Sequence, residues 1–321
     1  MAKTKKVVIT GGTGFVGSNL CRRSLALGYE THLLVRDGFD SWRIRDVLSD
    51  LQIHYVDFLD VGTIKEALRE IRPDWIFHLA AHGAYSFQNN VEEIFNTNFR
   101  ATHNLVEAAI EVGFDSFVNT GSSSEYGYKN DQQSEDDVLE PNSYYSVSKA
   151  ASTLYCSFVA KNKNLRMPTL RLYSVYGKYE DPRRLMPTLI LKALENQYPP
   201  LVSQVTVRDF ISVDDVVDAY FLAAEKGTIG MGEILNVSSG QQTSIGELVG
   251  LVKSQFSISG VPVWGDMPSK AWDTTCWVGC NDRIRKALGW SPRISLPEGL
   301  ENLADWFRTD LEIRSFYSMK E

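Results

Sequence analysis

The feature that most constrains the fold of this chain is a glycine-rich turn near its start. Residues 7–10 form an apolar, β-branched run, which is typical of a buried strand. Gly11, Gly14 and Gly17 follow, and a helical pattern begins directly after them. Glycine lets the backbone turn sharply and lets a pyrophosphate approach closely, and the new helix directs free N–H groups at that phosphate. The pattern predicts a dinucleotide site, and the alternative is a glycine-rich turn that holds no ligand.

After this turn, strand and helix signals alternate along the chain. Predicted strands cover residues 30–35, 52–56, 74–79, 116–120 and 167–172, and predicted helices cover residues 63–71, 98–112 and 144–161. Strands separated by helix-length segments imply a parallel sheet with helices on both faces. We therefore expect an α/β fold with a doubly wound parallel sheet, a Rossmann fold, in residues 1–175. Residues 176–321 are expected to form a smaller α/β domain that is intertwined with the first and binds the substrate.

The composition excludes several classes of protein. The 321-residue chain has a formal net charge of −7, whereas a general nucleic-acid binder is usually basic. No apolar run approaches the roughly 20 residues of a membrane span, and the first strand begins too early for a signal peptide to precede it. We expect no nucleic-acid or membrane partner and a cytoplasmic location. The four cysteines have no common zinc spacing, so we expect reduced thiols and no metal.

The ends of the second and third predicted strands bear on the choice of cofactor. An acidic residue about twenty residues past the glycines would accept a hydrogen bond from the ribose 2′-OH of NAD. This chain has Arg36 there, and a guanidinium suits a 2′-phosphate, which favours NADP. Asp37 next to it keeps NAD open, and a solvated surface arginine is the other interpretation. Asp57 and Phe58 end the third strand where an adenine would lie, although Asp57 equally fits a helix N-cap.

A second informative region carries candidate catalytic residues. Tyr145 and Lys149 are four residues apart on a predicted helix and therefore share a face. A lysine ammonium beside a phenol lowers the phenol pKa, so that the tyrosine exchanges a proton with a substrate hydroxyl or carbonyl near neutral pH. Residues 119–127 close the fifth strand at the carboxyl edge of the sheet, where the Ser122 hydroxyl can hold the same oxygen. We predict that these three residues are catalytic in a hydride transfer with a nicotinamide.

Taken together, the motifs resemble those of extended short-chain dehydrogenase/reductases of the nucleotide-sugar epimerase/dehydratase/reductase family. The matching segments are residues 10–17, residues 78–81, Asn98, the Tyr145/Lys149 pair and residues 208–215. The resemblance implies a nucleoside-diphosphate sugar as substrate. It also implies a homodimer formed through a four-helix bundle of residues 98–112 and 144–161. The expected cofactor contacts are Gly11, Gly14, Phe15, Val16, Gly17, Arg36, Asp57, Phe58, Leu79, Ala80, Ala81, Asn98, Tyr145 and Lys149.

The resemblance also implies a set of substrate contacts. Arg208 matches a family arginine that meets the diphosphate, and Lys270 lies where the family usually has a second arginine. Ser174 stands where the family often has an asparagine. His82 follows the fourth predicted strand on a loop at the edge of the sheet. The full set of substrate contacts that we expect is His82, Ser123, Ser124, Ser174, Arg208 and Lys270.

One departure from the family pattern bears on the reaction. The 4,6-dehydratases of the family usually carry a glutamate where this chain has Ser124, and here Glu125 stands one position later. This lowers the expectation of a dehydratase and favours reduction of a 4-keto-6-deoxy sugar by NADPH. A 4-epimerase of a nucleotide sugar that uses NAD or NADP is the alternative. A non-catalytic dinucleotide sensor is a further alternative, against which the intact catalytic residues argue.

Overall fold

Val7, Val8 and Ile9 are all fully buried because strand β1 (Lys6–Thr10) lies inside a sheet that is covered on both faces. The computed structural model describes residues 4–85, 87–227, 229–265 and 276–320. In this part of the chain, seven strands form a parallel sheet in the order β10-β6-β5-β4-β1-β2-β3. This confirms the predicted doubly wound sheet. Besides β1, the strands of this sheet are β2 (Glu30–Val35), β3 (Gln52–Tyr55), β4 (Trp75–His78), β5 (Ser116–Ser122), β6 (Thr169–Leu172) and β10 (Ile234–Val237).

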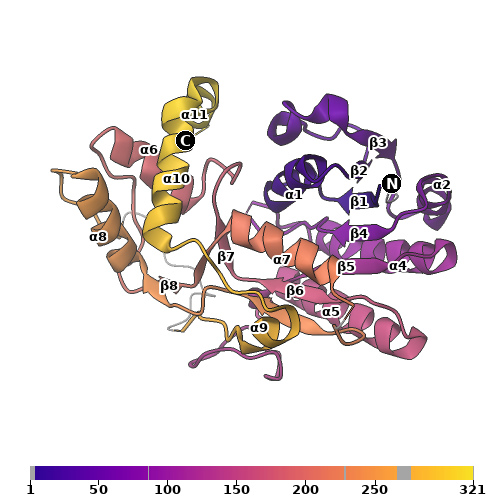
Figure 1. Ribbon diagram of the computed structural model, residues 1–321. Coiled ribbons are helices and arrows are strands. Elements are labelled where there is room, and N and C mark those ends of the chain that lie inside the picture. The colour runs from indigo at the N-terminus through magenta and orange to yellow at the C-terminus, as the bar shows by residue number, and fades with distance from the viewer. Residues whose placement is uncertain (1–3, 86, 228, 266–275, 321) are drawn as a thin grey trace.

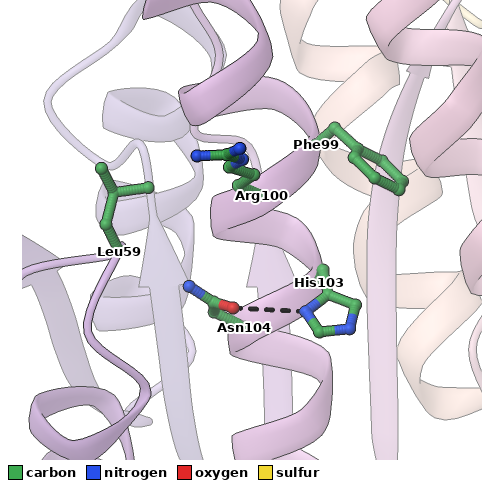
Figure 2. Close-up of a pocket in the computed structure, with 5 residues that line it drawn as sticks. All are labelled: Leu59, Phe99, Arg100, His103 and Asn104. Atoms are coloured by element: carbon green, nitrogen blue, oxygen red, sulfur yellow. Dashed lines mark hydrogen bonds between the residues drawn. The ribbon is translucent and has the colours of Figure 1, made fainter.

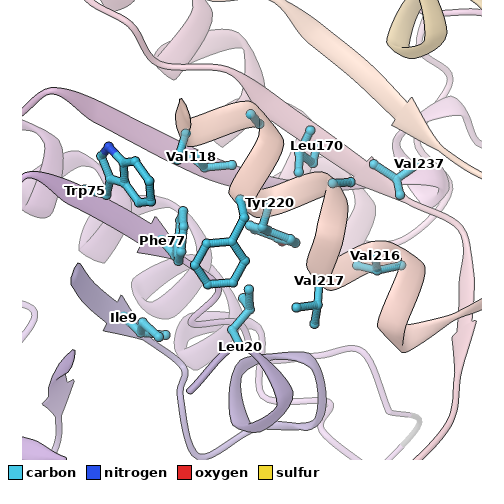
Figure 3. Packing of buried hydrophobic residues seen from close by; sticks show 14 of the residues in the cluster. Ile9, Leu20, Trp75, Phe77, Val118, Leu170, Val216, Val217, Tyr220 and Val237 are labelled. Atoms are coloured by element: carbon cyan, nitrogen blue, oxygen red, sulfur yellow. The ribbon is translucent and has the colours of Figure 1, made fainter. Parts of the chain in front are cut away.

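Two helical layers enclose the sheet (Figure 1). Because side chains alternate along a strand, Val7 and Ile9 join the core under α1 and α7, whereas Val8 joins the core on the opposite face. Tyr220 of α7 lies against the strands of the sheet in Figure 3. One face is covered by α1 (Phe15–Ala26) and α7 (Val213–Glu225). The other face is covered by α2 (Val61–Ile71), α4 (Ala101–Val112) and α5 (Tyr144–Lys163).

The second half of the chain builds a separate apolar core. Leu189, Leu248 and Leu303 are fully buried in it and come from three different helices. Strand β10 and helix α7 also belong to this half but lie on the large sheet, so residues after 175 contribute to both parts of the molecule. The remaining elements are α6 (Leu185–Leu194), α8 (Ile245–Phe256), α9 (Asp282–Leu288), α10 (Leu296–Thr309), α11 (Leu311–Ser318), β7 (Ser174–Tyr176), β8 (Val207–Arg208), β9 (Phe210–Ser212) and β11 (Thr243–Ser244).

One predicted element begins at a different residue. The helix expected over residues 98–112 starts with α3 (Val91–Phe95), continues through a π turn (Asn96–Arg100) and joins α4. The Asn90 side chain caps α3 by accepting a hydrogen bond from the Glu93 N–H at 3.2 Å. This capping signal extends the helix upstream. Asn98, which was expected to open a helix, therefore lies inside one, in a local widening of the turn.

Among the helices in the described part of the chain, none is long and apolar enough to span a bilayer.

Candidate active site

The glycine loop between β1 and α1 is tightly packed against neighbouring backbone. Gly11 has a φ of +68°, and a Cβ added there would lie 2.6 Å from the carbonyl carbon of Leu79. A Cβ on Gly17 would lie 2.1 Å from the carbonyl oxygen of Gly11. No side chain caps α1 at Gly14, so the first turn of the helix presents backbone N–H groups without a side-chain acceptor. The loop therefore fits a pyrophosphate at a helix start.

The glycine loop packs against the residues that follow β4. The His78 ring is 2% exposed and uses both nitrogens, with Nδ1 2.7 Å from Thr10 Oγ1 and Nε2 2.8 Å from Thr102 Oγ1. Burial, helped by the charge of Lys149, lowers the pKa of His78 to about 3. His78 is therefore a neutral packing residue, and the predicted cofactor contacts Leu79 and Ala80 follow it at the sheet edge.

This buried histidine predicts a pH dependence of stability. An unfolded histidine takes up a proton below about pH 6.5, whereas folded His78 stays neutral down to about pH 3. The bound proton therefore favours unfolding, and His78 should cost up to about 1.4 kcal/mol of stability per pH unit as the pH falls through this window. Chemical denaturation at several pH values should give a shallower slope for His78→Asn than for the wild type. Equal slopes would contradict the assignment.

Asn98 fixes the loop that follows β4. Its Oδ1 accepts a hydrogen bond from the His82 N–H at 2.8 Å, and its Nδ2 donates to the His82 carbonyl and to Ser148 Oγ, both at 2.8 Å. Ser148 in turn donates to the backbone carbonyl of Tyr145. The amide of Asn98 is thus engaged inside the protein, and it links the His82 loop to α5. Its predicted cofactor contact stays a prediction.

The predicted catalytic residues come together at the carboxyl edge of the sheet. Ser122 ends β5, and its hydroxyl lies 2.7 Å from Ser124 Oγ. The Ser122 side chain also acts on the phenol of Tyr145, whose pKa it lowers. Tyr145 stands in the first turn of α5, where Ser143 caps the helix, and Lys149 is buried one turn later. Two elements far apart in the sequence therefore place a hydroxyl, a phenol and an amine beside the end of β5.

The pKa of Tyr145 departs from the sequence-based expectation. Burial raises it to about 12, against the lowering effect of the hydrogen bond with Ser122. Lys149 is not among the groups that lower it, and burial lowers the pKa of Lys149 itself. Burial therefore outweighs the groups that lower the phenol pKa in this arrangement, and the lowering of this pKa by Lys149 stays a prediction.

The predicted substrate contacts are distributed around this edge. Ser124 is half-buried, whereas Ser123 is 6% exposed, which argues against a substrate contact for Ser123. Ser174 opens β7 beside β9. Arg208 donates to the Val207 carbonyl at 2.7 Å and lies over the ring of Trp277 at 5.4 Å. His82 Nε2 lies 3.4 Å from Glu93 Oε2. The predicted contact Lys270 lies outside the described residues.

The two residues that bear on the choice of cofactor are both exposed. The side chain of Arg36 is 77% exposed at the end of β2 and has a long ion pair with Glu93 at 3.8 Å. Asp57 accepts a hydrogen bond from the Leu59 N–H at 2.9 Å. The alternative role of Asp57 as a helix N-cap is wrong, because Asp60 caps α2. Ala81 is exposed, and Phe58 is half-buried.

A depression on the outer surface of α4 has a volume of about 430 Å³. Figure 2 shows Arg100 and Asn104 on the side of the helix that faces Leu59, with Phe99 and His103 on the other side. None of the predicted site residues lines it, so we do not assign the active site there.

Known proteins share the fold and the motifs of this site. The model of the NAD dependent epimerase/dehydratase family matches residues 7–238, and the chain belongs to that family. The protein is therefore an enzyme of the epimerase/dehydratase class.

Individual relatives cover nearly the whole chain. A mouse dTDP-D-glucose 4,6-dehydratase is 28% identical over 319 residues, which are 95% of this chain and 89% of the relative. The structure of UDP-glucose 4-epimerase from Thermotoga maritima with UDP-glucose has a TM-score of 0.85 at 25% identity, covering 95% of this chain and 99% of that one. The UDP-glucose 4-epimerase of Thermus thermophilus, solved with NAD, has a TM-score of 0.82 at 27% identity, covering 94% and 99%.

Proposed function

We propose that this enzyme inverts the C4 carbinol of a nucleoside-diphosphate hexose with NAD as cofactor. The observation that carries the proposal is the joining of Ser122, Tyr145 and Lys149 at the edge of the sheet beside the glycine loop. Ser124, which stands where dehydratases of the family carry a glutamate, supplies no carboxylic acid for the loss of water. Two of the similar solved structures are UDP-glucose 4-epimerases, one with the sugar nucleotide and one with NAD.

The roles that we propose for the side chains combine the family resemblance with the positions of the described residues. Tyr145 takes the proton of the sugar hydroxyl and later returns it, while Ser122 forms a hydrogen bond with the same oxygen. Lys149, one turn away on α5, orients the cofactor ribose. The nicotinamide, when bound, supplies the hydride acceptor and donor. Arg208 holds the diphosphate, and His82, Ser124 and Ser174 contact the sugar.

The direct test is incubation of the purified protein with NAD and either UDP-glucose or UDP-galactose. Interconversion of the two sugars with no net change in reduced nicotinamide is the expected result. The same assay with dTDP-glucose tests for 4,6-dehydration, which would appear as a 4-keto-6-deoxy product. Formation of that product without sugar interconversion would overturn the proposal.

Reduction of a 4-keto-6-deoxy sugar by NADPH is the second candidate, and the exposed guanidinium of Arg36 favours it. If Arg36 binds a 2′-phosphate, Arg36→Ala should weaken NADPH binding about tenfold or more, since a charge-assisted hydrogen bond contributes roughly 1.5–3 kcal/mol. NADH binding should not change. Arg45→Ala, at an exposed position of the same loop, is the matched control. Equal effects of Arg36→Ala on both cofactors would exclude this role.

We further propose that the enzyme is a homodimer through α4 and α5. Four large apolar side chains of α5 are exposed at spacings that follow one side of a helix: Tyr144, Val147, Leu154 and Phe158. Tyr155 of the same helix donates to Glu107 of α4 at 2.8 Å, so the two helices form a joined pair. A second copy of this pair would cover the exposed stripe and complete a bundle of four helices.

The dimer proposal predicts that charge on this stripe separates the subunits. Phe158 is 65% exposed, and an ionised carboxylate in its place would be buried without a partner in the bundle. Light scattering of Leu154→Glu/Phe158→Glu should therefore give a monomer. Val205→Glu is the control, because Val205 is 79% exposed on a different surface. A dimer that persists in the double variant would contradict the proposed interface.

A further inference from the structure

A buried ion pair lies directly behind the catalytic residues. Glu125 is fully buried and Arg171 is 1% exposed, and Arg171 Nε donates to Glu125 Oε2 at 2.8 Å. Sequence reasoning missed this pair, although a charged residue inside the apolar strand of residues 167–172 was its signal. Removing two charges from water is costly, so a pair of this kind is weak evidence for stability alone.

The other oxygen of Glu125 connects the two halves of the site. Its Oε1 accepts a hydrogen bond from the Ser122 N–H at 2.8 Å and another from Thr153 Oγ1 at 2.9 Å. Ser122 ends β5, and Thr153 lies on α5 one turn after Lys149. One carboxylate therefore holds the backbone of the catalytic serine and the helix that carries the catalytic tyrosine and lysine.

The space around this carboxylate is closely defined. A Cβ on Gly121 would lie 2.8 Å from Glu125 Oε1 and 2.9 Å from Arg171 Cγ. Arg171 is fixed on its far side as well, because its Nη1 donates to the Tyr126 hydroxyl at 3.0 Å. That hydroxyl donates to Asn236 Oδ1 of β10 at 2.7 Å. The position of Glu125 is thus set by packing and by hydrogen bonds from two strands, β5 and β6, and one helix, α5.

We propose that Glu125 is a positioning residue of the reaction, which fixes Ser122 against α5 and directs its negative charge at Tyr145 and Lys149. The inference rests on the proposed function of these two residues. Glu125 itself is enclosed by its own partners, so it acts through the residues that it holds.

The charge of Glu125 supports this role. Burial lowers the pKa of Lys149, and Glu125 opposes that effect and so favours the ammonium. Glu125 also raises the pKa of Tyr145, in the same direction as burial. The other titratable groups that act electrostatically with Tyr145 or Lys149 are Tyr85, Arg184 and Tyr220 for the tyrosine, and Cys156 and His78 for the lysine. Removing the negative charge should therefore lower both pKa values.

Glu125→Gln is the sharpest variant, because a glutamine keeps an acceptor for the Ser122 N–H while it loses the charge. The titration of Lys149 can be followed in full-length protein with ¹³C-labelled lysine, with the signal assigned by its loss in Lys149→Met. We expect the Lys149 midpoint to fall by about one unit, a tenfold change in proton affinity. The acid limb of the pH profile for sugar interconversion should move to lower pH as well.

Glu135→Gln is the matched control. The Glu135 side chain is 2% exposed, accepts a hydrogen bond from the Asn236 N–H at 2.7 Å and lies 3.7 Å from Arg283 Nε. It is a buried, paired carboxylate like Glu125, but it does not act on Lys149. A Lys149 midpoint that is the same in wild type, Glu125→Gln and Glu135→Gln would overturn the proposal. The lysine titration needs no turnover, so its result is independent of whether the proposed epimerase activity is found.

If Glu125→Gln does not fold, Thr153→Val tests whether the hydrogen bonds of Glu125 position Ser122 against α5. This variant removes the hydrogen bond from α5 to Glu125 and keeps the charge, so the Lys149 midpoint should stay unchanged. The turnover number should fall about tenfold with little change in KM, because the displaced group acts on the reacting oxygen rather than on binding. An unchanged turnover number in Thr153→Val would overturn the positioning role.

Discussion

Replacing Tyr145 by phenylalanine is expected to lower the turnover number by about 10²- to 10⁴-fold, the usual contribution of a general acid–base group. The phenol is the group that we propose takes the proton of the sugar hydroxyl and returns it. The change removes one hydroxyl beside Ser122 and leaves the ring, so the loss in stability should be no more than about 1 kcal/mol. Steady-state kinetics and chemical denaturation measure the two effects separately.

The matched control for this variant lies on the same helix. Tyr155→Phe also removes a phenol from α5, but that hydroxyl donates to Glu107 on the side of α4 and not to the catalytic serine. Its activity should match the wild type. If Tyr145→Phe retained full activity, the assignment of Tyr145 as the acid–base group would be wrong. If both variants lost activity equally, the cause would be damage to α5 and not the chemistry of Tyr145.

Replacing Gly17 by alanine is expected to abolish tight cofactor binding. The added Cβ would lie 2.1 Å from the Gly11 carbonyl oxygen and 2.9 Å from the Gly12 Cα, so backbone must move. The movement displaces the start of α1 from the pyrophosphate, and we expect a loss of affinity for NAD of at least about tenfold. Overpacking of this kind also costs about 1–3 kcal/mol of stability. Calorimetric titration with NAD is the measurement.

Gly250→Ala is the control for the glycine substitution. Gly250 lies inside α8, and a Cβ there would meet nothing within 4 Å. Alanine should therefore stabilise the protein by about 0.5–1 kcal/mol and leave NAD binding unchanged. Wild-type affinity for NAD in Gly17→Ala would show that the loop does not bind the cofactor through its close backbone packing.

Much of the architecture was predictable from local patterns. The β-branched run of residues 7–10, the glycines after it and the helix-length segments between strands each report on neighbouring residues only, and they were sufficient to predict a doubly wound parallel sheet. The helix start before Asn98 was not predicted, because the Asn90 cap lies upstream of the periodic segment of residues 98–112. That signal was present in the sequence, since asparagine followed by acidic residues is a common helix start.

The site was predictable to a lesser degree. Ser122, Tyr145 and Lys149 were identified from spacing and family resemblance, and the structure brings them together at the predicted edge. The roles of their neighbours depended on where each side chain points, which spacing along the chain does not specify. Ser123 is buried while Ser124 is half-buried, and the amide of Asn98 is engaged with the His82 backbone.

The sequence by itself determined the order of strands and helices, the glycine loop and the positions of the catalytic side chains along the chain. Each of these depends on periodicity, turn chemistry or spacing within a few residues. Only the tertiary structure decided that the Tyr145 phenol has a pKa of about 12 and that Glu125 is paired with Arg171 behind it. Both depend on burial and on contacts between distant segments, such as Glu125 and Arg171, which are 46 residues apart. Solvent exclusion is a property of the packed molecule and not of any one segment.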